Sequence, residues 1–335
     1  MKKEAMLYKK LGSGIVECFL CSHRCRIYDS KYGICGVRKN EGGTLYSMVY
    51  GEIMAAHVDP IEKKPLYHVM PESLSYSIAT IGCNFKCGFC QNWQLSQSAK
   101  REDVVDGIEM SPEEAVAEAS EQGCRSISYT YTEPTVFFEF AYDTSKAARA
   151  AGLKNVFVTN GFMTAEAIDA IAPYLDAANV DLKSFSEEFY AEKCKGRLGP
   201  VLDSIKRLRE KGVWVEVTTL LIPGENDSDG ELDAIADFIS GVSKDIPWHI
   251  SRFHPDYRFQ SRPPTSMEAL RRAKEIGSKH GLKYVYLGNV REGNDTRCHG
   301  CNEILVKRTH LETEINLIKH GKCVVCGAEI PGVWE

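Results

Sequence analysis

The sequence predicts an α/β protein built on a parallel sheet, with a small cysteine-rich, metal-binding module at each end of the chain. Two observations lead to this prediction. Between residues 75 and 290, short runs rich in β-branched and aromatic residues alternate with helical patterns, an order that produces parallel strands joined by right-handed crossovers. Toward each terminus, four cysteines gather in a short stretch. We therefore expect an N-terminal cysteine module over residues 1–50, a connecting segment over 51–74, an α/β body over 75–290 and a C-terminal metal knuckle over 291–335.

The strands and helices of the body follow one another in a regular order. Residues 75–81 predict the first strand, and Ser111 then caps a helix with Pro112 at its first position and acidic residues in its first turn. The next strand is expected at 126–131, and the helix after it ends at Gly152. Further strands are expected at 155–159, 179–182, 213–221, 248–252 and 284–287, with helical patterns at 165–171, 202–211, 231–239 and 267–280. The number of strands fits an open doubly wound sheet as well as a barrel.

The composition is that of an ordinary soluble globular chain. Of the 335 residues, 43% are apolar and 26% are charged, and the formal net charge is -5. A net negative charge disfavours electrostatic binding of duplex nucleic acid. The N-terminal residues lack the apolar core of a signal peptide, and no stretch approaches the roughly 18 apolar residues that a membrane span needs. We expect a cytoplasmic protein with neither a membrane nor a nucleic-acid partner.

The thirteen cysteines indicate metal ligands rather than disulfides. Their number is odd, the chain is not small, and no export signal is present. Eleven of them form three groups, and only Cys124 and Cys194 stand alone. Cysteine groups with metal-ligand spacing in a reducing compartment explain this pattern best. An oxygen-labile cluster would also suit an anaerobe or a well-protected cytosol.

The most informative group is Cys83, Cys87 and Cys90, which form a C-x3-C-x2-C loop with no fourth cysteine close by. A cubane iron–sulfur cluster has four irons, and ordinary electron carriers hold each iron with a thiolate. Three thiolates therefore leave one iron open to a substrate or cofactor. A three-thiolate zinc loop is the weaker alternative, because zinc motifs favour a C-x2-C pair with a second pair elsewhere.

The C-terminal group consists of two C-x2-C knuckles separated by 21 residues, formed by Cys298, Cys301, Cys323 and Cys326. Such a pair of knuckles is typical of tetrathiolate sites in zinc ribbons and rubredoxin-like modules. Zinc and mononuclear iron both accept four tetrahedral thiolates, so the sequence leaves the choice of metal open. A module of this size with little apolar content is expected to need its metal to fold.

The N-terminal group is less regular and comprises Cys18, Cys21, Cys25 and Cys35, with His23 as a spare ligand. These cysteines can hold either zinc or an auxiliary iron–sulfur cluster. The sequence alone favours structural zinc over the cluster, while a group without metal is the remaining alternative.

The central loop closely resembles that of the radical SAM superfamily, down to the aromatic Phe89 before the last cysteine. The resemblance implies a partial (β/α)6 TIM-like barrel with its chemistry at the carboxyl ends of the strands. It also implies a [4Fe–4S] cluster on Cys83, Cys87 and Cys90 whose open iron chelates the amino and carboxylate groups of S-adenosyl-L-methionine (SAM). Reductive cleavage of the S–C5′ bond of SAM would then yield a 5′-deoxyadenosyl radical.

Further segments resemble the pyruvate formate-lyase activating enzyme branch of that superfamily. Tyr131-Thr132-Glu133-Pro134 stands where the branch has Gly-Gly-Glu-Pro, which implies that Glu133 accepts hydrogen bonds from the SAM ammonium. Asp181-Leu182-Lys183 matches the branch as it stands, and strand alternation directs Asp181 and Lys183 to one side. Thr159-Asn160-Gly161 resembles a turn near the SAM carboxylate, and Arg252-Phe-His254-Pro255 a segment that reaches the ribose. The residues implied to bind the cofactor are Phe89, Glu133, Thr159, Asn160, Asp181, Lys183 and His254.

The order of motifs along the whole chain resembles the AmmeMemoRadiSam-system radical SAM family, whose members are similar to pyruvate formate-lyase activating enzyme. This resemblance implies hydrogen abstraction from an unknown protein or small molecule, with a glycyl-radical protein as the substrate by analogy, and an electron donor of flavodoxin or ferredoxin type. A non-catalytic iron–sulfur electron-transfer or redox-sensing protein is the alternative from another class. The histidines and lysines of residues 57–68 indicate that this segment is a recognition segment or a solvated connection rather than part of the core.

Overall fold

The centre of the molecule is an eight-stranded sheet in the order β16-β15-β14-β13-β12-β11-β9-β8. The computed structural model describes residues 2–98, 107–309 and 311–335. The parallel strands are β9 (Leu74–Ala79), β11 (Ser126–Tyr129), β12 (Lys154–Thr159), β13 (Ala177–Asp181), β14 (Trp214–Leu221), β15 (Trp248–Arg252) and β16 (Val285–Gly288). Strand β8 (Ala55–Pro60) joins one edge antiparallel to β9. In the described parts of the chain β8 and β16 are not paired, so the sheet stays open and the predicted partial (β/α)6 barrel is confirmed.

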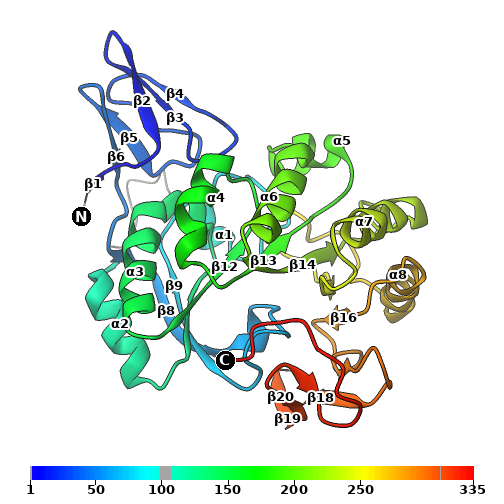
Figure 1. Cartoon of the computed structure of the whole chain (residues 1–335). Coiled ribbons are helices and arrows are strands. Elements are labelled where there is room, and N and C mark those ends of the chain that lie inside the picture. The colour runs from blue at the N-terminus through cyan, green and yellow to red at the C-terminus, as the bar shows by residue number, and fades with distance from the viewer. Residues whose placement is uncertain (1, 99–106, 310) are drawn as a thin grey trace.

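The longer helices follow the strands in sequence and lie along the outside of the sheet (Figure 1). Their bounds are α1 (Trp93–Ser96), α2 (Pro112–Glu121), α3 (Phe138–Ala150), α4 (Ala165–Ile171), α5 (Glu187–Phe189), α6 (Leu198–Glu210), α7 (Asp229–Val242) and α8 (Met267–Lys279). The Ser111 hydroxyl accepts a hydrogen bond from the Glu114 amide at 3.1 Å and closes a capping box at the start of α2, as predicted. Gly152 has a φ of 80° just after α3, which explains why the helix ends there.

The two terminal modules lie at opposite ends of the sheet (Figure 1). The N-terminal module contains two small sheets, made of β2 (Tyr8–Gly12), β3 (Ile15–Cys18) and β4 (Arg26–Ile27), and of β1 (Lys3–Glu4), β6 (Thr44–Ser47) and β5 (Arg38–Glu41). A short pair follows, β7 (Glu52–Ile53) with β10 (Ile108–Glu109). The C-terminal module contains β17 (Thr296–Arg297), β18 (Ile304–Thr309), β19 (Glu312–Asn316), β20 (Ile318–Lys319) and β21 (Lys322–Cys323). Among the described residues, no helix has both the length and the apolar character needed to cross a membrane.

The segment before β9 belongs to the core rather than to the surface. Leu66, Tyr67, His68 and Val69 are all buried at the amino-terminal end of the barrel. The Glu216 carboxylate, on β14, accepts hydrogen bonds from the backbone amides of Tyr67 at 3.0 Å and His68 at 2.8 Å. The expectation of a recognition segment or a solvated connection was therefore wrong for Tyr67 and His68. A buried carboxylate needs donors, and this segment supplies them.

His68 is held as a neutral ring. Its Nδ1 donates to the Pro331 carbonyl at 2.7 Å, and its Nε2 accepts from the Tyr286 hydroxyl at 2.7 Å. Burial lowers the pKa of His68 to about 4, although the Glu216 carboxylate opposes this shift. The pKa of an unfolded histidine is about 6.5. Below that pH the unfolded chain therefore binds a proton that the folded protein does not bind.

We expect the stability to fall as the pH decreases from about 6.5 to about 4, by about 2 kcal/mol between pH 7 and pH 5 from this residue. Anaerobic guanidinium unfolding at the two pH values measures the effect. The His68→Asn variant should lose this part of the pH dependence, whereas His57→Asn, at an exposed position, should keep it. Equal pH dependence in wild type and His68→Asn would show that the neutral ring does not contribute.

Candidate functional site

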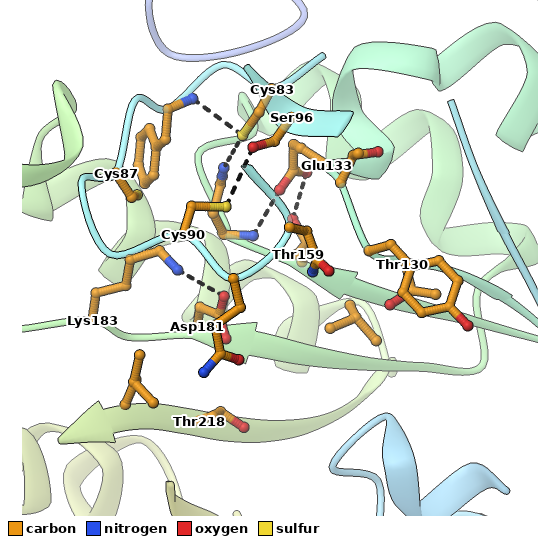
Figure 2. Close-up of a pocket in the computed structure, with 18 of the residues that line it drawn as sticks. Cys83, Cys87, Cys90, Ser96, Thr130, Glu133, Thr159, Asp181, Lys183 and Thr218 are labelled. Atoms are coloured by element: carbon orange, nitrogen blue, oxygen red, sulfur yellow. Dashed lines mark hydrogen bonds and ion pairs between the residues drawn. The ribbon is translucent and has the colours of Figure 1, made fainter. Parts of the chain in front are cut away.

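A cavity of about 530 Å³ lies at the carboxyl ends of the parallel strands (Figure 2). Its size falls in the range of small-molecule and cofactor sites. The predicted residues that line it are Cys83, Cys87, Phe89, Cys90, Glu133, Thr159, Asn160, Asp181 and Lys183. These side chains come from the loop after β9 and from the ends of β11, β12 and β13, so parallel strands bring them together at one edge of the sheet.

The loop that carries the three cysteines is fixed by backbone contacts with the turn after α5. The Lys86 amide donates to the Cys194 carbonyl at 2.8 Å, and the Gly88 amide donates to the Lys193 carbonyl at 3.2 Å. Gly196 allows the close approach, because a Cβ atom there would lie 2.3 Å from the Phe85 ring. Contacts with the barrel therefore shape the loop.

The three cysteines have the chemistry expected of cluster ligands. All three face the same cavity, and the sulfur atoms of Cys83 and Cys90 receive polar contacts (Figure 2). The Phe85 amide donates to Cys83 Sγ at 3.3 Å, and the Ser96 hydroxyl lies 3.3 Å from Cys90 Sγ. Burial raises the pKa of the Cys83 and Cys90 thiols, so metal binding must release their protons. Hydrogen bonds to the sulfurs are one means by which a protein tunes an iron–sulfur cluster.

Glu133 is the buried link between β11 and β12. Its Oε1 accepts hydrogen bonds from the Thr135 amide at 3.0 Å and the Thr159 hydroxyl at 2.7 Å, and also from the Thr135 hydroxyl. Its Oε2 accepts one from the Asn160 amide at 2.8 Å. Burial raises the pKa of Glu133, although these donors oppose the shift. A carboxylate has about four acceptor positions, so Oε2 keeps capacity for one more donor from the cavity.

Asp181 and Lys183 form an ion pair at the end of β13. The Lys183 ammonium lies 2.8 Å from Asp181 Oδ2 and 5.9 Å from the centre of the Phe89 ring. Burial disfavours the charged ammonium, but the Asp181 carboxylate and the nearby Cys87 raise the pKa of Lys183 above its ordinary value. The lysine therefore stays charged beside the cysteine loop. The pair presents both signs of charge to the cavity, which suits a zwitterionic ligand.

Comparison with known proteins decides the family. A sequence model of the radical SAM superfamily matches residues 77–239, the stretch that holds the cysteine loop and β9 to α7. An uncharacterized protein of Methanocaldococcus jannaschii, MJ0808, is 43% identical over 333 residues and matches 98% of each chain. This chain belongs to the radical SAM superfamily. Cleavage of SAM at an iron–sulfur cluster is the chemistry of this superfamily, and the three cysteines of the matched stretch line the cavity.

Two further proteins, one compared by sequence and one by structure, are similar to this chain. A putative glycyl-radical enzyme activating enzyme of M. jannaschii, MJ1632, is 26% identical over 261 residues, which cover 76% of this chain and 89% of that protein. A radical SAM methyltransferase of Sphaerobacter thermophilus has a solved structure that aligns with a TM-score of 0.51 at 19% identity, over 66% of this chain and 68% of the other. The second likeness shows that the radical SAM fold is shared.

His254 is the predicted site residue that lies apart from the rest. It is exposed and does not line the cavity, and its ring nitrogens lie 3.1 and 3.3 Å from the Gln91 amide nitrogen. Gln91 does line the cavity, which places His254 beside its mouth. The structure therefore places His254 beside the cavity rather than in its lining, unlike the other residues implied to bind the cofactor.

The cavity also contains residues that the sequence interpretation did not place there. Lys64 lines it and is buried, with its ammonium 2.6 Å from Asp59 Oδ2, and burial lowers the pKa of Lys64 to about 8. Tyr131 donates its hydroxyl to the same carboxylate and has a φ of 60°. That left-handed backbone is the one that glycine favours, and glycine is the residue that the related branch has at this position. The Lys-Lys-Pro sequence before β9 was the feature of the sequence that could have placed Lys64 in the cavity.

The four C-terminal cysteines converge as a tetrathiolate site would require. Cys298 Sγ lies 3.6 Å from Cys326 Sγ, and Cys301 Sγ lies 3.8 Å from Cys323 Sγ. All four sulfur atoms lie within 4.8 Å of one another. A tetrahedral zinc with bonds of about 2.3 Å places its sulfurs about 3.8 Å apart, so these residues fit a mononuclear ion. The geometry supports a small metal-binding module and does not distinguish zinc from iron.

We expect Cys301 and Cys326 to resist alkylation in the native protein, although both are exposed, because a bound ion would hold their thiolates. Iodoacetamide labelling followed by peptide mass spectrometry measures this, with the same protein treated with a strong chelator as the control. The chelator should make both thiols react at the rate of free cysteine. Rapid labelling before chelator treatment would contradict a bound metal.

Proposed function

We propose that the protein binds a [4Fe–4S] cluster through Cys83, Cys87 and Cys90 and uses it to cleave SAM reductively. One observation carries this proposal. Three cysteines, with no fourth cysteine in the lining, face acidic and basic side chains across one cavity. When bound, such a cluster supplies an electron at low potential and an open iron that takes up the amino and carboxylate groups of SAM. The resulting 5′-deoxyadenosyl radical would abstract hydrogen from a second substrate.

The residues of the chain would bind and orient the methionyl group. The free acceptor position of Glu133 Oε2 and the carboxylate of Asp181 suit the SAM ammonium, whereas Lys183 suits its carboxylate. Asn160 donates from Nδ2 toward Cys83 Sγ at 3.7 Å and to Asn84 at 2.7 Å, so the turn after β12 couples the cysteine loop to this pocket. These contacts would hold SAM in one orientation relative to the loop.

We propose further that the substrate is a protein that becomes a glycyl-radical enzyme. The similarity to the putative glycyl-radical enzyme activating enzyme MJ1632 supports this, as does the likeness of several motifs to the pyruvate formate-lyase activating enzyme branch. Within the superfamily we assign the chain to the AmmeMemoRadiSam-system family, and we expect a flavodoxin- or ferredoxin-type electron donor and a cytoplasmic, anaerobic setting. A small molecule is the second candidate substrate, because Lys64 lines the cavity and offers it a cation.

The test is to reduce the anaerobic protein with dithionite, add SAM and measure 5′-deoxyadenosine by mass spectrometry. The same reaction is then run with candidate glycyl-radical proteins and followed by EPR. Formation of 5′-deoxyadenosine with a glycyl-radical doublet supports both proposals. Formation of 5′-deoxyadenosine with a changed small molecule supports the second substrate instead. No 5′-deoxyadenosine from a protein with full iron content would contradict the function and favour a non-catalytic electron carrier.

Removal of the Asp181 carboxylate should weaken SAM binding. A charge-assisted hydrogen bond contributes roughly 1.5–3 kcal/mol, so Asp181→Ala is expected to raise the Kd for SAM about ten- to hundredfold. Anaerobic titration of SAM, followed by EPR of the reduced cluster, measures the affinity. Asp143→Ala is a matched control, because Asp143, on α3 of the barrel, also pairs with a lysine (Lys3) and is similarly exposed, at 30% against 35%. Equal affinity in wild type and Asp181→Ala would make the carboxylate structural.

A further inference from the structure

The four N-terminal cysteines line a small cavity of their own. Cys18 ends β3, Cys21 and Cys25 follow on the next turn, and Cys35 precedes β5. The barrel closes the cavity with Thr135 and Val136, both buried. None of the thirteen cysteines forms a disulfide. The group is therefore a preformed, enclosed set of four thiols that the SAM chemistry does not use.

The spacing of the sulfur atoms separates this group from the C-terminal one. Among the described residues, the C-terminal four are the one set of three or more potential ligands whose ligand atoms all lie within 4.8 Å of one another. The sulfur atoms of no three N-terminal cysteines all lie within 4.8 Å of one another. No two of these cysteines form a sulfur–sulfur contact like the 3.6 Å contact between Cys298 and Cys326. Four thiolates on one zinc ion would stand about 3.8 Å apart.

The central loop shows the same wider spacing. Cys83, Cys87 and Cys90 line one cavity, yet their three sulfur atoms do not all lie within 4.8 Å of one another. In a four-iron cluster each thiolate binds a different iron, so the sulfur atoms stand farther apart than sulfurs that share one ion. In a two-iron cluster, by contrast, two thiolates share each iron and would form close pairs. The N-terminal cysteines, like the central three, therefore lack the close sulfur contacts of a single-ion or two-iron site.

We propose that Cys18, Cys21, Cys25 and Cys35 hold an auxiliary [4Fe–4S] cluster rather than the zinc ion that the sequence alone favoured. With four thiolates, this cluster has no open iron, so it does not bind SAM. The proposal rests on the N-terminal cysteines alone and holds whatever the substrate of the central site is.

A buried cation beside these cysteines supports the assignment. Arg38 lines the cavity and is only 2% exposed. Its Nη1 donates to Glu139 at 2.9 Å and its Nη2 donates to the Met6 carbonyl, but its Nε has no partner. A buried guanidinium N–H without an acceptor is costly. A sulfur atom of a four-iron cluster would supply the acceptor that the Nε–H of Arg38 lacks.

The cavity lies directly behind the SAM pocket. Thr135, in its wall, donates its amide to Glu133 at 3.0 Å, and Glu133 lines the SAM pocket. A second contact also links the two sites: the His23 ring lies 2.8 Å from the carbonyl oxygen of Asn84, the residue that follows Cys83. Hydrogen bonds of Thr135 and His23 therefore connect the walls of the two cysteine sites.

Counting acid-labile sulfide tests the proposal, because zinc sites contain none. Anaerobically purified, 57Fe-labelled wild type should contain about eight sulfides per chain, and the Cys83→Ala/Cys87→Ala/Cys90→Ala variant about four. Mössbauer spectra of that variant should show a four-iron cluster. Adding Cys35→Ala should remove the remaining sulfide, whereas adding Cys124→Ala should not.

Two outcomes would overturn the assignment. One is about four sulfides in wild type, all of them lost in the triple variant. The other is a triple variant that is folded by circular dichroism and retains zinc but no sulfide. If the triple variant does not fold, the wild-type sulfide count alone decides between one cluster and two. Because no step involves SAM, failure of the proposed SAM cleavage would leave this result unchanged.

Discussion

Replacing any one of Cys83, Cys87 and Cys90 by alanine is expected to reduce 5′-deoxyadenosine formation to the level of a protein-free control. All three cysteines face the same cavity, and no other cysteine lines it. The loop is held by backbone bonds to Lys193 and Cys194, so the variants should fold, but each would lack one of the thiolates that the cluster needs. Iron content and product formation, measured anaerobically on the same samples, check the prediction.

The control for this experiment is Cys124→Ala, the same substitution at a buried cysteine outside the three groups. It should keep wild-type iron content and product formation. Product from a Cys83→Ala/Cys87→Ala/Cys90→Ala variant would mean that the central site lies elsewhere.

Arg38→Met is expected to lower the free energy of unfolding by about 3–5 kcal/mol, because it leaves the Glu139 carboxylate buried without its partner. The Arg38 and Glu139 side chains are only 2% and 1% exposed and lie 2.9 Å apart. The pair joins β5 of the N-terminal module to α3 of the barrel. Anaerobic guanidinium unfolding measures the loss.

Arg24→Met provides the matched control. Arg24 also joins the N-terminal module to a barrel helix, through Glu166 on α4 at 3.0 Å, but these side chains are 50% and 44% exposed. An exposed pair contributes about 0–1 kcal/mol, so this variant should remain close to wild type. Equal losses in the two variants would show that burial of the Arg38 pair does not determine its contribution.

The sequence predicted most of the barrel because its elements carry local signals. Strand β15 and helix α4 begin and end where the pattern placed them, and the cap at Ser111 and the stop at Gly152 act within a few residues. Parallel strands buried on both faces give apolar runs that stand out from the helices between them. The short strands of the terminal modules, some of only two residues, carry no such signal and were not predicted.

The sequence by itself predicted the superfamily of this protein and the residues that gather at its cavity. The spacing of Cys83, Cys87 and Cys90 and the residues at the ends of β11 and β13 indicated an open iron–sulfur site, because ligand type and number follow from covalent sequence. Only the tertiary structure decided distances between distant segments: His68 is buried at the amino-terminal end of the barrel, Glu133 keeps one free acceptor position, and the N-terminal sulfur atoms gather less closely than the C-terminal ones. Those properties depend on packing between elements that are far apart in sequence, and no local pattern of residues encodes them.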